Sequence, residues 1–127
     1  MDLHALRRIA VSEGPRITKN RRLFPQEINA NFAVIEWHGS LEQSLRVLAC
    51  THERGLGNNA ERSATGACGT GATAIGATLY QLYRLPDKYP IHISMPRGEL
   101  QVYRKSGQFY LIGSAEKFLH NTDAYMQ

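Results

Sequence analysis

The chain has 127 residues, of which 43% are hydrophobic and 20% are charged, and this composition is that of an ordinary folded domain. It excludes the apolar-poor, strongly charged profile of disordered proteins, and no apolar run approaches the roughly 20 residues of a membrane span. The N-terminus lacks the basic-then-apolar layout of a secretory signal. We therefore expect a single soluble domain in the cytoplasm, with no membrane partner.

Cysteine usage and charge give weaker indications. Cys50 and Cys68 lie far apart, with no second pair and no metal-ligand spacing, so we expect thiols in a reducing compartment and no metal site. The formal net charge of +4 indicates an attraction to anions, but a solvated basic face is the commoner explanation. Without interleaved aromatic residues or a DNA-binding motif, nucleic acid is not an expected partner. The early basic residues are Arg7, Arg8, Arg16, Lys19, Arg21 and Arg22.

The first predicted element is a short amphipathic helix over residues 2–9. Asp2 is placed as its N-cap, and its apolar residues recur on one face that would pack on a sheet. The pattern then dissolves into Gly14-Pro15, several charges and Pro25. These residues predict a poorly ordered surface connection over residues 12–25.

Two strands and a helix are predicted next. Residues 28–37 and 44–51 are rich in β-forming side chains, and Gly39-Ser40 between them indicates a hairpin. The polar loop 58–66 then leads to an apolar stretch over residues 72–85 with helical spacing. We expect a loop that delivers the chain to the start of a helix.

Three short strands complete the prediction, over residues 91–95, 99–104 and 108–112. Pro96-Arg97-Gly98 and Lys105-Ser106-Gly107 separate them, and both tripeptides favour turns. The sequence therefore predicts a meander of hairpins after the helix.

The strongest chemical feature is a thiol where the glycine-rich loop becomes a helix, in Cys68-Gly69-Thr70-Gly71. The first turn of a helix exposes backbone N–H groups and the positive end of its dipole, which stabilise a thiolate or a carboxylate. A cysteine pKa at such a site falls from about 8.5 into the range of roughly 3.5 to 7.5. Gly69 and Thr70 would then hold an α-carboxylate beside the thiol. A buried structural cysteine at a tight junction explains the same residues equally well.

The segment Gly69–Ala74 also satisfies the dinucleotide-binding pattern G-x-G-x-x-A. That fingerprint requires a buried apolar strand directly before the glycines, whereas residues 58–67 are polar and small. We interpret this match as a coincidence.

A second cluster, His52-Glu53-Arg54-Gly55, falls at the end of the second predicted strand. A guanidinium binds a carboxylate in bidentate fashion and a carboxylate binds an ammonium, so Glu53 and Arg54 would together recognise a zwitterionic amino acid. Asn29, near the start of the first strand, would donate and accept hydrogen bonds at a ligand. The alternatives are an exposed acid–base pair and a turn asparagine.

Several motifs in this chain occur in the order found in diaminopimelate epimerases, and the chain resembles that family over most of its length. They are Leu23-Phe24-Pro25, Ile28-Asn29-Ala30-Asn31-Phe32, Glu53-Arg54-Gly55-Leu56-Gly57, Ala67-Cys68-Gly69-Thr70-Gly71-Ala72, Met95-Pro96-Arg97-Gly98-Glu99-Leu100 and Tyr110-Leu111-Ile112-Gly113-Ser114-Ala115.

The resemblance implies an α/β (α+β) fold, in which a mixed, mostly antiparallel sheet wraps around a central helix. Residues 1–127 would form a single, incomplete C-terminal domain of an enzyme built from two similar halves. The implied function is cofactor-independent epimerisation of LL-diaminopimelate to meso-diaminopimelate, a step toward lysine and peptidoglycan. The implied partners are a small amino-acid substrate, a missing N-terminal half or partner subunit, and a second copy in a homodimer.

The resemblance also implies roles for single residues. Cys68 and Glu53 would be catalytic, with Cys68 one of two cysteines that face opposite sides of the substrate α-carbon. Asn29, Glu53 and Arg54 would bind the substrate, and Gly69 and Thr70 would receive a carboxylate at the helix end. Neither a metal nor pyridoxal phosphate is implied.

The chain departs from the family pattern in two places. It lacks the half that carries the opposing cysteine, and Cys50, within a predicted strand, is poorly placed to replace that residue. The loop 58–66 is also longer than the family's link, which leaves the position of Cys68 relative to Glu53 and Arg54 open. We therefore expect no activity from this chain alone, and two alternatives stay open: a non-catalytic binding module of the same fold, and a racemase for another amino acid.

Overall fold

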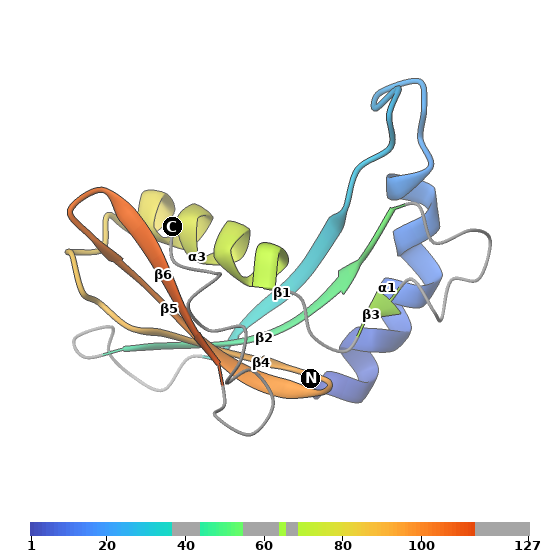
Figure 1. Cartoon of the computed structure of the whole chain (residues 1–127). Coiled ribbons are helices and arrows are strands. Elements are labelled where there is room, and N and C mark those ends of the chain that lie inside the picture. The colour runs from blue at the N-terminus through green and yellow to red at the C-terminus, as the bar shows by residue number, and fades with distance from the viewer. Residues whose placement is uncertain (37–43, 55–63, 66–68, 114–127) are drawn as a thin grey trace.

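The computed structural model describes residues 1–36, 44–54, 64–65 and 69–113, and its strands form one sheet with a helix on each face (Figure 1). This α+β architecture confirms the predicted fold class. The elements in chain order are α1 (Leu3–Thr18), β1 (Ala30–Glu36), β2 (Leu45–His52), β3 (Ala64–Thr65), α3 (Gly69–Tyr83), β4 (Ile91–Met95), β5 (Gly98–Lys105) and β6 (Gln108–Gly113).

The sheet is mixed and mostly antiparallel. Its strand order is β1-β2-β4-β5-β6, with β3 paired to β2. The predicted pairing of the first two strands is confirmed, as is the meander of the last three. The parallel pairing is between β2 and β4, which lie on either side of α3 in the sequence. In Figure 1 the sheet curves around α3, as the resemblance implies.

Strand β2 is buried on both faces and separates two apolar cores. Its residues Leu45, Val47 and Ala49 pack on the α3 side, whereas Leu48 and Cys50 pack on the α1 side. Successive side chains of a strand point to opposite faces. Strand β2 therefore contributes side chains to both cores.

Helix α1 is longer than predicted, and the expectation of a poorly ordered connection over residues 12–25 is wrong for its first part. The helix runs through Gly14 and Pro15 to Thr18, and the Pro15 carbonyl accepts the Lys19 N–H at 3.1 Å. Packing on the sheet outweighs these local helix-breaking residues. The buried residues recur every fourth position, which places them on one face: Leu6, Ala10, Gly14 and Thr18.

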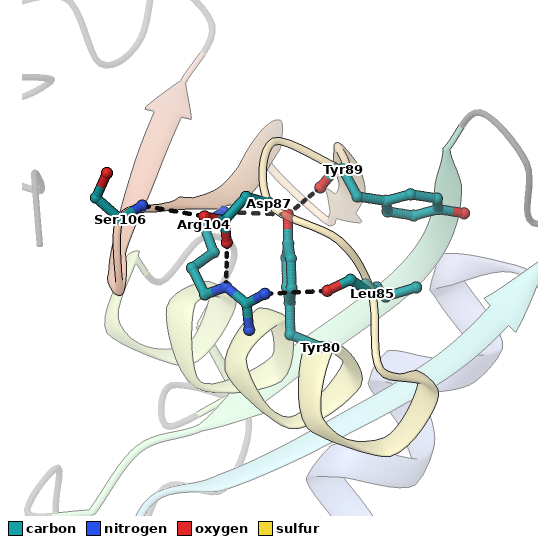
Figure 2. Close-up of polar contacts among 6 residues, drawn as sticks. All are labelled: Tyr80, Leu85, Asp87, Tyr89, Arg104 and Ser106. Atoms are coloured by element: carbon teal, nitrogen blue, oxygen red, sulfur yellow. Dashed lines mark hydrogen bonds and ion pairs between the residues drawn. The ribbon is translucent and has the colours of Figure 1, made fainter.

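The far end of α3 is tied to the β5–β6 hairpin by a polar cluster (Figure 2). The Tyr80 hydroxyl donates to the Tyr89 carbonyl and accepts the Arg104 backbone N–H at 3.0 Å. The Arg104 guanidinium lies 4.8 Å from the centre of the Tyr80 ring and donates to Asp87 at 2.6 Å and to the Leu85 carbonyl at 3.1 Å. The C-terminal end of α3 is thereby fixed to the sheet.

In the described part of the chain, neither helix is long and apolar enough to cross a membrane.

Candidate functional site

The start of β1 and the end of β2 meet at one end of the sheet, because the two strands are antiparallel and Ala30 pairs with His52. Residues just outside the two strands are therefore neighbours. The Asn29 side-chain oxygen accepts the Arg54 backbone N–H at 2.8 Å. Two predicted substrate-binding residues, 25 positions apart in the sequence, thus lie in direct contact.

The Arg54 side chain extends over the preceding loop. Its guanidinium lies 3.5 Å from the Glu27 carbonyl oxygen, and the Glu27 carboxylate pairs with Arg21 at 2.8 Å. Arg54 is exposed and Glu53 is half-buried. This end of the sheet therefore presents a guanidinium that water and small anions can reach.

Asn31 adds a further polar group that the sequence analysis did not assign. It pairs with Thr51 across the two strands, and the Thr51 hydroxyl donates to the Asn31 side-chain oxygen at 2.7 Å. Thr51 continues the alternation of β2 that faces α3. Two asparagines stand two residues apart in Asn29-Ala30-Asn31, which is the spacing of side chains on one face of a strand. This spacing is a sequence signal from which Asn31 could have been predicted.

A groove continues from Asn31 along α3. Its volume is about 330 Å³, and two of its walls are formed by the small side chains of Ala33 and Ala74. The small residues leave open space between the edge strand and the helix. The full lining is Asn31, Ala33, Ala74, Ile75, Thr78 and Leu79.

Helix α3 runs from Gly69 to Tyr83, so the predicted helix is present and begins within the glycine-rich segment. Gly69 is half-exposed and Thr70 is exposed, so solvent reaches the first turn. The backbone N–H groups of a first helical turn have no partner within the helix, and they favour anions. Cys68 directly precedes this turn in the sequence and lies outside the described residues, as do Gly55 and most of the loop 58–66.

Cys50 lies in a different environment. It is fully buried in the core between β2 and α1, and burial raises the pKa of its thiol. A raised pKa keeps a thiol protonated and unreactive near neutrality. Cys50 is therefore poorly suited to exchange protons with a substrate.

Within residues 1–36, 44–54, 64–65 and 69–113, no group of three or more His, Cys, Asp and Glu side chains is arranged to hold a metal ion.

These features define the chain as an α+β protein with a polar cluster at one end of its sheet. Over 89 residues it is 36% identical to the diaminopimelate epimerase of Methanothermobacter thermautotrophicus, which supports the membership of the diaminopimelate epimerase family that the motifs predict. The matched segment covers 70% of this chain and 26% of that relative, so the chain spans about a quarter of the relative's length. No protein-family model matches the chain.

Proposed function

We propose that this chain supplies one half of the active site of a cofactor-independent diaminopimelate epimerase. The reaction would interconvert LL- and meso-diaminopimelate in the cytoplasm, on the route to lysine and peptidoglycan. The contact between Asn29 and Arg54 supports this proposal most directly, because it brings together residues of two separate family motifs. The start of α3 directly after Cys68 adds support.

The proposed chemistry is a proton transfer at the substrate α-carbon. The Cys68 thiolate removes the α-proton, and the electron pair of the C–H bond stays on the α-carbon as a carbanion. A second cysteine, from polypeptide outside this chain, donates its thiol proton to the opposite face. In the reverse direction the two cysteines exchange roles, and no other reactant is consumed.

The binding groups follow from the charges of an amino acid. The Arg54 guanidinium would bind a carboxylate, and the Glu53 carboxylate would bind an ammonium group and act with Cys68 at the reacting centre. The Asn29 amide nitrogen is not engaged by the bond to Arg54, so it would donate to the substrate. Backbone N–H groups at Gly69 and Thr70 would receive the α-carboxylate, where the helix dipole also stabilises developing negative charge.

Thiol alkylation tests the role of Cys68. Because the start of a helix lowers a cysteine pKa, iodoacetamide should label Cys68 with a pH midpoint well below about 8.5, whereas Cys50 should react only after unfolding. Diaminopimelate should slow the labelling of Cys68. Peptide mapping by mass spectrometry measures both rates.

Two variants sharpen the test. Arg54→Ala should abolish the protection by diaminopimelate while leaving the intrinsic labelling rate unchanged. Arg46→Ala, a matched control on β2 whose side chain is 52% exposed, should keep the protection. A Cys68 midpoint near that of an ordinary thiol, or protection that survives Arg54→Ala, would contradict the proposal.

The exposed Arg54 beside Asn29 also fits a second candidate, a binding module of the same fold without catalysis. In that case Cys68→Ala should bind diaminopimelate as tightly as the unmodified chain, and addition of the missing half should produce no epimerisation. Binding of another amino acid in preference to diaminopimelate would instead indicate a racemase with a different substrate. Calorimetric titration separates these outcomes.

A further inference from the structure

His52 is a buried histidine directly before the proposed substrate-binding residues Glu53 and Arg54. It is the last residue of β2 and is 1% exposed. Its ring lies so close to Gly14 of α1 that a Cβ there would sit 2.3 Å from the ring Cγ and 2.4 Å from Cδ2. Because real side chains do not approach so closely, Gly14 is needed for α1 to pack on this ring.

The ring makes this contact without hydrogen bonds. Among the described residues, neither nitrogen of the His52 ring has a hydrogen-bond partner. The buried Thr18 hydroxyl, one turn further along α1 than Gly14, also lacks one. A buried polar group without a partner costs stability, so an apolar ring would serve packing better. Packing alone therefore does not account for an imidazole at this position.

The surroundings of His52 favour its neutral form. Burial is the main cause that lowers its pKa, and the positive charge of Lys19, at the end of α1, lowers it further. Across the strands it pairs with Ala30 of β1 and Ala64 of β3, which have no titratable groups. On its own strand the buried Cys50 thiol shares its face, and no described acidic side chain forms an ion pair with it.

The position of His52 links α1 to the candidate site. Ala30, the first residue of β1, pairs with His52, the last residue of β2. This pair therefore fixes the positions of Asn29, directly before β1, and of Arg54, shortly after β2. The 2.8 Å bond between Asn29 and Arg54 lies just beyond this pair. A displacement of the ring would therefore move two of the proposed binding residues.

We infer that His52 is a positioning residue for the proposed substrate site: its neutral ring, seated on Gly14, holds Arg54 against Asn29, and protonation releases this contact. The biological meaning of the inference rests on the proposed function. The geometry itself is testable without substrate.

The test is an NMR titration of the whole chain from about pH 8 to about pH 5. The Arg54 backbone amide and the Asn29 side-chain amide should shift together with the His52 ring, with a shared midpoint below the ordinary histidine value of about 6.5. The Arg104 amide, bonded to Tyr80 at the other end of α3, should not shift. If His52 contributed only to overall stability, its protonation would instead shift the Arg54, Asn29 and Arg104 signals together.

Two variants complete the experiment. His52→Phe should keep the fold and the Asn29–Arg54 contact but lose the pH-dependent shift. Gly14→Ala should displace the Arg54 amide signal already at neutral pH, whereas Glu13→Ala, a neighbouring change that adds no atom to the interface, should not.

The inference is overturned if Arg54 titrates equally in His52→Phe, if it stays unshifted while His52 titrates, or if the Arg104 amide shifts with it. Binding of diaminopimelate is measured separately by calorimetry. A lack of binding with normal amide shifts would contradict the proposed function alone, whereas binding without the shifts would contradict this inference alone.

Discussion

The Tyr80 hydroxyl is a single group that joins the end of α3 to two other segments. It is buried, donates to the Tyr89 carbonyl and accepts the Arg104 N–H. We expect Tyr80→Phe to lower the free energy of unfolding by about 1–3 kcal/mol, because it leaves the buried Tyr89 carbonyl and the partly buried Arg104 N–H without this partner. Urea denaturation measures the change.

Tyr103→Phe is the matched control for this prediction. Tyr103 stacks on Tyr110 through its ring, at 5.2 Å between ring centres, so removal of its hydroxyl should change the stability by less than about 0.5 kcal/mol. Equal losses in the two variants would show that the Tyr80 hydroxyl contributes no more than a surface group.

At the scale of residues, the motifs named residues that the structure brings into contact, but their roles in binding or catalysis are not tested by this contact. Asn29 and Arg54 stand in motifs and lie in contact, although their roles remain predictions. The cross-strand partners of Asn31 and His52, which are Thr51 and Ala30, became known only from the register of β1 and β2. Register is a relation between distant segments, so a local pattern does not show which residues lie opposite each other.

At the scale of elements, the contact between α3 and β5 depends on Gly76. A Cβ at this position would lie 2.5 Å from Cγ1 of the buried Val102. Alanine favours a helix over glycine by about 1 kcal/mol, but the clash forces the helix away from the sheet at a cost of about 1–3 kcal/mol. We therefore expect Gly76→Ala to be net destabilising, as measured by the thermal midpoint.

The double variant Gly76→Ala with Val102→Ala is the control. Removal of the Val102 methyl groups relieves the clash, so the double variant should be less destabilised than the sum of the two single changes. Strictly additive losses would mean that the two residues do not oppose one another.

Helix α1 shows the limit of element prediction. Its first turns follow from Asp2, whose carboxylate accepts the Ala5 N–H at 2.8 Å, and from apolar spacing. Its later turns contain Gly14 and Pro15, which locally favour a stop. The helix continues because Gly14 packs on His52 and Thr18 is also buried, and both facts depend on the presence of the sheet.

At the scale of the whole molecule, the proposed reaction needs more protein than this chain provides. The chain spans about a quarter of the length of its relative, and the buried Cys50 is poorly suited to be the second cysteine. We expect the purified chain to exchange no α-proton of diaminopimelate into heavy water, as followed by NMR.

Addition of a polypeptide that carries the proposed opposing half of the active site should produce exchange. In the reconstituted protein Cys68→Ala should abolish this exchange, and Cys50→Ala should retain most of it. Robust exchange by the chain alone would contradict the requirement for a second half. Exchange that survives Cys68→Ala would contradict the proposed base.

The sequence by itself determined the strands β4 to β6, the pairing of β1 with β2, the presence of α3, and the family resemblance. Each of these depends on spacing and turn residues that are neighbours along the chain. The tertiary structure decided the parallel pairing of β2 with β4, the burial of β2 between two helices, the full length of α1 and the position of His52. These depend on the free energy of packing between distant segments, which local patterns do not contain.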